Sequence, residues 1–331
     1  MIALRGIVRV SVLIACGVVW TLCPVVAPPA HAQDYPSKPI RVVIAGGPGS
    51  SPDIIARLLG NKILATLGRP FVMDIRPGAS GGIGAEVAAK AAPDGYTLFM
   101  LTSQLSSAAA MYTKLRYNLV EDFAPISLVG TTPSVLVVNP SLPAASIKDL
   151  IALVKPRPGV LRFGTAGVGS SSHLPAVLFA AMAKIDMLHI PYKDSPNALV
   201  GTMTGEVGLS FQPLPACLPM VRSGKLKALG VTGLARSALA PDLPTIAETV
   251  PGYEFMLWQG IVAPARTPPA IIAKLNAEVV KALNAPDVRE QMAAIGNEPL
   301  PSTPEAYARH ITEQVEKMKE IVRLGGIKPQ D

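Results

Sequence analysis

Cysteine is scarce in this sequence, which has 3 cysteines in 331 residues. Two of them, Cys16 and Cys23, lie in an N-terminal segment that we expect to be removed, so only Cys217 would remain. An internal disulfide is therefore excluded, and a chain of this length can bury a sufficient apolar core without one. Because Cys217 has no C-x-x-C partner, we expect it to be a small buried hydrophobic residue.

Runs of basic residues and a second long apolar segment are also missing. The 30 Lys and Arg residues exceed the 23 Asp and Glu, but they are scattered singly. No RRM-like or zinc-finger spacing appears, so nucleic acid is not an expected partner, and the charge favours a small anionic ligand only weakly. After the N-terminal segment, no apolar stretch is long enough to span a bilayer.

Histidine is rare as well, and it forms no metal-ligand pattern. Beyond His31, the histidines are His173, His189 and His310, which stand far apart and lack H-E-x-x-H or similar spacing. We therefore expect no metal site and no cofactor. We expect His173, at a helix start, to form part of a polar pocket wall. His189 should be structural within a strand, and His310 should face solvent on the last helix.

The N-terminal segment has the order of a secretory signal. Two arginines form a basic start, an apolar stretch follows, and Ala30-His31-Ala32 is an A-x-A cleavage site. An alternative is a lipoprotein box at residues 13–16, but cleavage that early would leave an apolar tail exposed. We expect residues 1–32 to be a cleaved signal peptide and the mature protein to be exported.

Strands and helices alternate along the remaining chain in two units. The first unit is predicted to contain strands at 40–46, 71–75 and 96–101 and helices at 53–67 and 82–91. This β-α-β-α-β order with short connections predicts a parallel sheet with right-handed crossovers. The second unit is predicted to contain helices at 146–155, 173–184 and 195–204 and strands at 160–165, 187–192, 207–211 and 226–232.

Two long extended segments, 123–140 and 253–264, join these units, and the first is interrupted by Thr131-Thr132-Pro133. The chain leaves the first unit near 131 and returns near 255, so the first domain is discontinuous. The predicted domains are 33–131 with 255–331, and 132–254. A cleft between two such α/β lobes is where a ligand would bind.

Two helices with clear start signals follow the second extended segment. Thr267 is predicted to cap a helix with Pro268 at its first position, on which apolar residues recur every four residues from Ile271 to Leu283. Thr303 and Pro304 repeat this start, and Gly325-Gly326 ends the last helix.

Two glycine- and serine-rich loops follow predicted strands, one in each unit. The first loop is "GGPGSSPD" (46–53) and the second loop is "GTAGVGSSSH" (164–173). The first lacks the lysine and spacing of a Walker loop, and Ser172 replaces the third glycine of a dinucleotide fingerprint in the second. Glycines permit close approach of a ligand, serines add hydroxyl donors, and the N–H groups of a helix start favour an anion.

The first loop alone is better explained by an ordinary strand-to-helix turn in which Asp53 supports the helix start. Two such loops change that interpretation. Each lies at the carboxyl end of a strand, one in each lobe, so they would face each other across the cleft. This arrangement favours a clamp for a ligand smaller than a triphosphate, such as a carboxylate.

Several segments together resemble the Bug (TctC-type) family, the extracytoplasmic solute-binding proteins of tripartite tricarboxylate transporters. They are "YPSKPIRVVIAGGPGSSPDIIARLL", "RPGASGGIGAEVAAKAAPDGYTLFM", "EDFAPISLVG", "HIPYK" and "APARTPPAIIAKLNAEV". The resemblance implies a two-lobed α/β type II periplasmic-binding-protein fold, with two α/β domains joined by two crossing strands. It also implies a monomer in the periplasm, without a cofactor, that delivers a small carboxylate to the large and small subunits of a membrane permease. The carboxylate would be a di- or tricarboxylate or an aromatic acid, and presentation to a membrane sensor is the alternative.

The resemblance places the ligand contacts in the loops of both lobes, with backbone N–H groups, hydroxyls and water holding the carboxylate in place of an arginine. In the first lobe the contacts are Gly47, Pro48, Gly49, Ser50, Ser51, Asp53, Thr102 and Ser103. In the second lobe they are Thr165, Ala166, Gly169, Ser170, Ser171, Ser172, His173, Ser195 and Gln212. The chain departs from the family pattern at Ala45-Gly46, Asp194 and Gln212-Pro213, beside the expected pocket, which bears on the distal group of the ligand.

One catalytic motif is present. Gly78–Gly82 fits G-x-S-x-G, which makes a secreted serine hydrolase using Ser80 an alternative. A nucleophile elbow places its serine directly at a strand end, whereas Arg76-Pro77-Gly78 intervenes here, so we expect no enzyme. Tyr192, Phe211 and Trp258 are the aromatic residues nearest the predicted loops, where pocket lining and core packing are both open to them.

Overall fold

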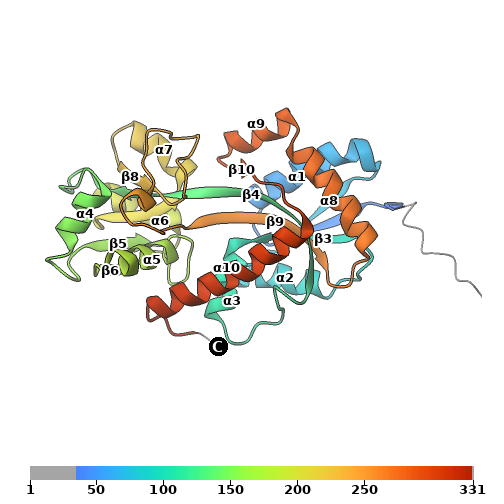
Figure 1. The fold of residues 1–331 in the computed structure, drawn as a ribbon, viewed down its shortest axis with the longest axis horizontal. Helices are drawn as coiled ribbons and strands as arrows, with labels where there is room; N and C mark the ends of the chain where they lie inside the picture. The colour runs from blue at the N-terminus through green and yellow to red at the C-terminus, as the bar shows by residue number, and fades with distance from the viewer. Residues whose placement is uncertain (1–34, 330–331) are drawn as a thin grey trace, which may run out of the picture.

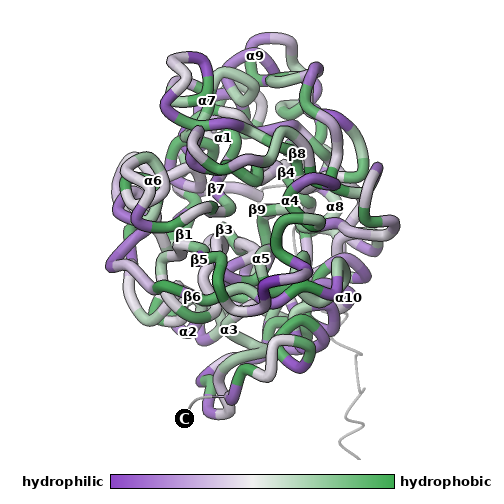
Figure 2. The backbone as a smooth tube through the Cα atoms, turned by 90° about the vertical axis from the view of Figure 1, so that its left-hand side faces the viewer, coloured by the Kyte–Doolittle hydropathy of each residue, from purple (hydrophilic) through white to green (hydrophobic). Residues whose placement is uncertain are grey.

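The computed structural model describes residues 35–329, which fold into two α/β lobes joined by two long strands (Figure 1). The predicted signal peptide, residues 1–32, lies outside the described residues. Within 35–329, no helix is both long enough and apolar enough to cross a membrane. Hydrophobic residues are concentrated in the central strands, and hydrophilic residues are frequent in the outer loops (Figure 2).

The sheet of the first lobe begins with three parallel strands in the order β2-β1-β3. They are β1 (Ile40–Ile44), β2 (Phe71–Ile75) and β3 (Thr97–Thr102), connected by α1 (Ser51–Leu67) and α2 (Gly82–Ala89). Val42 and Ile44 belong to the core on the α1 side, and Val43 belongs to the core on the α2 side. A strand covered by helices on both faces needs a continuous apolar sequence, which explains the composition of β1.

The second lobe repeats this alternation around the strand order β4-β7-β5-β6, and β8 also pairs with β4. Its strands are β5 (Arg162–Thr165), β6 (Leu188–Pro191), β7 (Leu209–Pro213) and β8 (Lys227–Val231). Its helices are α4 (Ile147–Val154), α5 (Leu174–Ala183), α6 (Ser195–Thr204) and α7 (Leu214–Arg222). Cys217 of α7 is a free, buried cysteine as predicted, and burial raises the pKa of its thiol to about 12.

Two antiparallel strands connect the lobes, β4 (Phe123–Val138) and β9 (Met256–Pro264). The predicted interruption of β4 at Thr131-Thr132-Pro133 is wrong, because the strand continues through these residues. Up to Pro133 the strand pairs with β9, and from Ser134 it pairs with β7 and β8. The missing N–H of Pro133 is tolerated because it falls where β4 changes partners.

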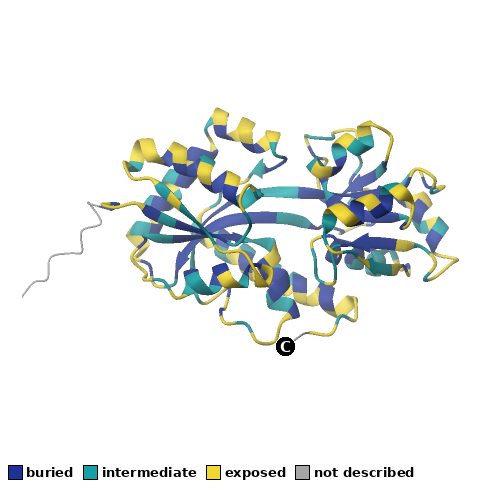
Figure 3. Cartoon of the chain, turned by 180° about the vertical axis from the view of Figure 1, so that it is seen from behind, coloured by how far each residue is buried: buried dark blue, intermediate teal, exposed yellow. Residues whose placement is uncertain are grey.

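The crossing strands are less buried between the lobes than inside them (Figure 3). Thr131 and Thr132 of β4 and Met256 and Leu257 of β9 are partly exposed, whereas Pro133–Val138 and Trp258–Pro264 are buried. The two strands therefore pass through a region that the side chains of neither lobe fill completely.

The C-terminal helices cover the first lobe and reach the second. They are α8 (Pro269–Leu283), α9 (Pro286–Ala294) and α10 (Pro304–Leu324), and a short strand, β10 (Glu298–Pro299), pairs with β4. Helix α10 runs along both lobes (Figure 1), with Ile311 in the core of the first and Ile321 in the core of the second. The boundaries 33–131, 132–254 and 255–331 stay a prediction, since α10 contributes to both cores.

Several local predictions at helix ends need correction. Thr267 does not cap α8; the helix begins at Pro269, and the Thr267 hydroxyl donates to the carbonyl of Pro264 at 2.7 Å. Thr303 caps α10 as predicted, because its hydroxyl accepts from Ala306 N–H at 3.2 Å. Three helices were not predicted: α3 (Ser103–Met111), α7 and α9. Helices α3 and α7 begin directly where β3 and β7 end, without a connecting loop.

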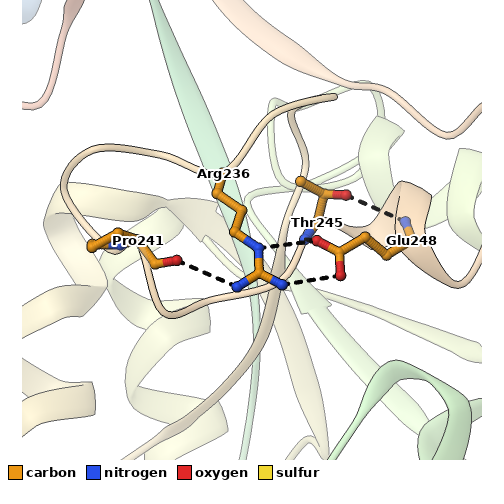
Figure 4. A network of polar contacts seen from close by, with 4 residues as sticks. All are labelled: Arg236, Pro241, Thr245 and Glu248. Carbon is orange, nitrogen blue, oxygen red and sulfur yellow. Dashed lines mark hydrogen bonds and ion pairs between the residues drawn. The ribbon is translucent and has the colours of Figure 1, made fainter.

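The connection between β8 and β9 is held by a polar network (Figure 4). Arg236 donates to both carboxylate oxygens of Glu248 at 3.1 Å, and Thr245 and Glu248 form a reciprocal capping box. The same connection reaches the first lobe, where the Ser237 hydroxyl donates to Glu298 at 3.0 Å.

Candidate ligand site

A cavity of about 410 Å³ lies between the lobes, at the carboxyl ends of the strands. Its polar lining residues are Ser50, Ser51, Thr102, Ser103, Gln104, Thr132, Ser171, Gln259 and Asn297. Its apolar lining residues include Pro213, Pro215, Ala216, Leu257, Trp258 and Ile295. A larger cavity of about 520 Å³ lies around residues 109–122 and 315–319, but none of the predicted contacts lines it. The cavity between the lobes is therefore the candidate site.

Two helices of the first lobe begin at the cavity wall. Ser50 and Ser51 stand at the start of α1, and Thr102 and Ser103 stand at the start of α3, directly after β3 ends. The first N–H groups of a helix have no intrahelical acceptor and carry a partial positive charge. Four of the predicted first-lobe contacts thus lie at the cavity, in the arrangement that binds small anions in other proteins.

A buried amide network supports Ser51. The Gln259 side-chain amide donates to Ser51 Oγ at 2.9 Å and to Asn297 Oδ1 at 2.6 Å, and Asn297 donates to Ser51 Oγ at 3.1 Å. Both amide residues are buried, with 5% and 2% exposure. Since Ser51 Oγ accepts two hydrogen bonds, its own hydroxyl proton is left to donate to another group.

The network leaves one atom of Gln259 without a partner. Gln259 Oε1 is buried and makes no hydrogen bond within residues 35–329. Turning the amide over would only exchange its oxygen and nitrogen, so one of the two atoms stays unpaired in either orientation. An unpaired buried polar atom costs free energy, so Gln259 is held in place by the two hydrogen bonds of its other amide atom at the expense of this one.

The other predicted contacts of the first loop, Gly47, Pro48, Gly49 and Asp53, shape the loop and do not line the cavity. Asp53 is 3% exposed, accepts from Gly49 N–H at 2.9 Å and pairs with Arg57 at 2.8 Å. Gly49 has a φ of 74°, a conformation that favours glycine. Gly47 and Pro48 complete this turn. Their proposed ligand contacts, and that of Asp53, stay a prediction.

The second loop contributes only Ser171 to the cavity, because its other polar groups bond to one another. Thr165 Oγ1 lies 2.6 Å from His189 Nε2, and Ser172 Oγ accepts from Ala166 N–H at 2.9 Å. Ser170 Oγ is 3.1 Å from Ser172 Oγ. The predicted contacts Thr165, Ala166, Gly169, Ser170, Ser172 and His173 are absent from the cavity lining within the described residues.

His173 and His189 are close in space, although the sequence separates them. Their ring centroids lie 4.3 Å apart, and both rings stack near Phe163. Burial, and then the neighbouring His189, lower the pKa of His173 to about 4, and burial lowers the pKa of His189. His173 Nδ1 accepts from Gly169 N–H at 3.1 Å. The pair is neutral at pH 7, so it holds the loop and offers no positive charge to an anion.

Ser195 and Gln212 also lie away from the cavity lining. Ser195 opens α6, where the side chain of Asp194 accepts from Asn197 N–H at 2.9 Å. Gln212 is 2% exposed in β7, with its Nε2 unpaired among the described residues, and the next residue, Pro213, does line the cavity. The ligand roles of Ser195 and Gln212 stay a prediction.

Of the three aromatic residues, Trp258 lines the cavity. Behind it, the rings of His310 and Tyr307 lie 4.9 and 6.1 Å from the Trp258 ring. The prediction that His310 faces solvent is wrong: its Nε2 is buried, because His310 shares the helix face of Tyr307 and points toward β9. Phe211 is fully buried in the core of the second lobe, and Tyr192 packs against Gly201.

Sequence reasoning missed four of the nine polar lining residues. Gln104 lies in α3, an unpredicted helix, and Thr132 lies where β4 was thought to be interrupted. Gln259 and Asn297 are brought to Ser51 by tertiary pairing, and no local motif surrounds either of them. One local signal does point to the α3 side of the site. The apolar residues 98–101 are followed directly by the polar residues "TSQ" at 102–104.

The lobes touch on both sides of the cavity. Gly169 of the second loop packs on Met111 of α3, so that a Cβ there would lie 2.0 Å from Met111 Sδ. Gly296, after α9, packs on Pro215 of α7, where a Cβ would lie 1.8 Å from Pro215 Cγ. These glycines allow contacts that a side chain would prevent.

Ser80 lies outside this cavity in an exposed turn, with a φ of 53°. Among residues 35–329, each histidine makes its ring contacts elsewhere: His173 and His189 in the second lobe and His310 at Trp258. A serine nucleophile needs a base within hydrogen-bond reach, and the described residues provide no such pairing for Ser80.

Fold and cavity define a two-lobed solute-binding protein. The model of the family described as "Tripartite tricarboxylate transporter family receptor" matches residues 55–327, so the chain belongs to this TctC family. The family, which includes the Bug proteins, consists of periplasmic solute-binding receptors that bind small carboxylates, and it is not an enzyme family. The resemblance and the fold class inferred from the sequence are confirmed.

Relatives match over nearly the whole chain. Protein BugT of Bordetella pertussis is 38% identical over 308 residues, which cover 92% of this chain and 94% of BugT. The solved structure of R. palustris Rpa4515 with adipate is 33% identical and covers 90% of this chain and 100% of its own, with a TM-score of 0.77. MatC from Rhodopseudomonas palustris with bound malate is 30% identical and covers 87% of this chain and 100% of its own, with a TM-score of 0.72.

Proposed function

We propose that this protein is exported through a cleaved signal peptide, residues 1–32, and captures a small carboxylate in the cavity between its lobes in the periplasm. The observation that carries the proposal is the start of α1 and α3 at one cavity wall, with hydroxyl donors at both starts. Helix starts and hydroxyls favour an anion, and the relatives solved with adipate and malate support a carboxylate.

The first lobe provides most of the binding groups. Ser51 donates its hydroxyl proton to a carboxylate oxygen, because Gln259 and Asn297 already occupy its acceptor positions. Ser50, Thr102 and Ser103 add hydroxyl and backbone N–H donors, and Ser171 closes on the ligand from the second lobe. Such charge-assisted hydrogen bonds in a partly dry cavity are stronger than bonds between neutral groups. The ligand is a di- or tricarboxylate or an aromatic acid.

The protein then delivers its ligand to a tripartite permease with a large and a small membrane subunit. This step is tested by uptake of the radiolabelled ligand in cells that lack the gene for this chain. Uptake should fall to background and return when the gene is supplied. Normal uptake without the chain would contradict the transport role and leave ligand binding standing.

Ligand capture is tested by thermal unfolding of the purified protein with a panel of carboxylic acids and their amides. A ligand at a hundred times its Kd adds about 2.7 kcal/mol, which raises the Tm by a few degrees. An acid should raise the Tm and its amide should not. A panel of mono-, di-, tri- and aromatic acids that leaves the Tm unchanged throughout would contradict carboxylate capture.

A further inference from the structure

We infer that the outer end of the second lobe is a docking surface for a membrane of anionic phospholipids. This surface, called the basic end below, consists of helix α4, the ends of α5 and α7, and the starts of β5, β6, β7 and β8 with the turns that precede them. The inference does not depend on which ligand the cavity holds. It rests on the distribution of charge in the second lobe, on the lack of ion pairs there and on exposed apolar side chains.

The topology brings these segments to one end of the lobe. The cavity lies at the carboxyl ends of the strands, so the strand starts lie at the opposite end, on the left in Figure 1. Gly159 N–H donates to the carbonyl of Asp186 at 3.2 Å, and Gly208 N–H donates to the carbonyl of Arg162 at 2.9 Å. The turn before β5 therefore lies beside the start of β6, and β8 starts opposite the end of β4.

Charge is distributed unevenly within the second lobe. Eight of the ten Lys and Arg residues of 132–254 belong to the basic end, but only three of the seven acidic residues do. The cations are Lys148, Lys155, Arg157, Arg162, Lys184, Arg222, Lys225 and Lys227, and the acids are Asp149, Asp186 and Glu206. Eight positive and three negative charges give the basic end a net charge of +5, while two positive and four negative charges give the rest of the lobe −2. Cations that are scattered in the sequence are thus gathered by the fold.

These cations have no carboxylate partners. Within the part of the chain that the structure describes, Arg236 is the one cation of 132–254 that forms an ion pair, and it lies outside the basic end. Lys227 Nζ donates to a backbone carbonyl, that of Leu142, at 3.1 Å. In the first lobe, by contrast, cations such as Lys62 pair with carboxylates, here Asp287 at 2.8 Å. The basic end can therefore bind an external anion without breaking an internal ion pair.

The helix dipole explains only part of this charge. Lys155 and Lys184 are the C-cap residues of α4 and α5, and Arg222 is the last residue of α7. A cation at these positions offsets the partial negative charge of a helix end, but the effect fades beyond the last turn. Arg157 and Lys225 lie beyond it and are exposed. Their charges are better explained by an external partner.

Exposed apolar side chains among the cations favour a lipid surface as that partner. Val160 is 66% exposed and Leu188 is 48% exposed, and each follows a cation of the basic end by a few residues. A membrane interface offers anionic headgroups to Lys and Arg and an apolar boundary to Val and Leu. Mobile headgroups also adapt to cations that are spread over a whole end of a lobe. Anionic phospholipid therefore fits this surface in both charge and hydrophobicity.

Docking through the basic end leaves the cavity accessible. The cavity lies at the carboxyl ends of the strands, and the basic end lies at their starts, so the membrane would not cover the cavity. The protein would stay close to the membrane and could still exchange its ligand.

Vesicle flotation tests this with the exported protein, recovered from the periplasm. Vesicles of equal parts phosphatidylglycerol and phosphatidylcholine are compared at pH 7 with vesicles of phosphatidylcholine alone. At low salt, at least about 10-fold more protein should float with the anionic vesicles, and ~0.5 M NaCl should abolish the difference by screening. Equal flotation with both vesicles, or none with either, overturns the inference. Binding to right-side-out membranes of the cells without binding to anionic vesicles would indicate a protein partner and would overturn it too.

A pair of double variants locates the contact. Arg157→Glu combined with Lys225→Glu should lower flotation with anionic vesicles at least about 10-fold. Arg69→Glu combined with Arg289→Glu changes the net charge equally, at exposed positions of the first lobe, and should float like the wild type. An equal loss in both would show that total charge, and not the basic end, is responsible. The rise in Tm with a bound acid should be unchanged in both, which shows that fold and cavity are intact.

The apolar contribution is tested by Val160→Ser, which should lower flotation with anionic vesicles about 3-fold. Val72→Ser, at a 51% exposed position of the first lobe, is the matched control and should not change it. Flotation of Val160→Ser at the level of the wild type would overturn the contact of this side chain with the membrane.

Discussion

The two glycine- and serine-rich loops have the same composition and different uses. In the first loop, Ser50 and Ser51 line the cavity, and the acceptor positions of Ser51 are taken by Gln259 and Asn297. In the second loop, Thr165, Ser170 and Ser172 bond within the loop or to His189. A hydroxyl can serve a ligand only if its own surroundings leave it free to do so.

This difference between the loops predicts that one contributes mainly to the stability of the fold and the other mainly to ligand binding. The second loop is built around the His173-His189 contact, so its polar groups should matter mainly for folding. The first lobe keeps donors at two helix starts, so its polar groups should matter mainly for the ligand. The following predictions test this division, beginning with the largest expected effect.

The largest effect should be on the pH dependence of stability in the second loop. Burial and His189 lower the pKa of His173 from 6.5 to about 4. Between these values the unfolded chain binds a proton that the folded protein does not, so stability is fully present above the unfolded pKa and falls as the pH drops toward the folded one. The loss should be on the order of 3 kcal/mol, measured by urea unfolding from pH 7 to pH 4.

His173→Asn is the control for this titration, since its side-chain oxygen can accept from Gly169 N–H but does not titrate. Its stability should vary less between pH 6.5 and pH 4, while ligand affinity at pH 7 stays near that of the wild type. A profile as steep as that of the wild type would show that His173 is not the responsible group.

The second effect concerns the contact between the lobes. Gly296→Ala places a Cβ against Pro215 and should weaken ligand binding about 100-fold, or about 2.7 kcal/mol, because the lobes no longer meet. Gly224→Ala is matched to it, with a φ of 72° but open space around the new Cβ. Both should lose some stability through backbone strain, and only Gly296→Ala should lose affinity. Equal affinities would mean that this contact plays no part in binding.

A smaller effect should distinguish Ser51 and Ser171, which line the cavity from different lobes. Ser51→Ala removes a hydroxyl that donates to the carboxylate and should weaken binding about 10- to 100-fold, as expected for a bond to a charged group. Ser171→Ala should cost about 3-fold or less, since the second lobe adds one hydroxyl at an exposed position. Calorimetry with the best acid measures both. A larger loss in Ser171→Ala would reverse the division between the loops.

The smallest effect is expected far from the cavity. Arg236→Gln breaks the ion pair with Glu248, whose side chains are 48% and 46% exposed. Exposed pairs contribute about 1 kcal/mol or less, so the Tm should fall by a few degrees at most and ligand affinity should not change. A loss of affinity would show that the connection between β8 and β9 acts on the cavity through its Ser237-Glu298 contact.

Much of the fold could be predicted from local patterns. The buried run of β1 and the helix start at Thr303 are encoded in a few neighbouring residues, and the structure confirms both. Helices α3 and α7 were missed because each begins without a loop, in segments of small residues or prolines that give no clear helical period. At Pro133 the error was of the opposite kind, because the sequence predicts an interruption where the strand β4 continues. A proline in a strand is tolerated where the strand changes its pairing partner.

About half of the polar cavity wall could also be predicted, because Ser50, Ser51, Thr102 and Ser103 follow directly after strands of a parallel sheet. The other half could not. Gln259 and Asn297 are separated from Ser51 by more than 200 residues of sequence, and only the folded chain brings their amides to its hydroxyl. The hydrogen bonds within the second loop were equally invisible, since its composition is that of the first.

The sequence by itself determined the class of this protein: its alternating strands and helices, two loops at strand ends and family motifs specify a two-lobed carboxylate receptor of the TctC type. The tertiary structure decided which groups face the ligand cavity. Local patterns set the path of the backbone because neighbouring residues interact wherever the chain goes. The free or occupied state of a hydroxyl or a helix start depends on groups far away in the sequence, and these meet only when the two lobes have folded together.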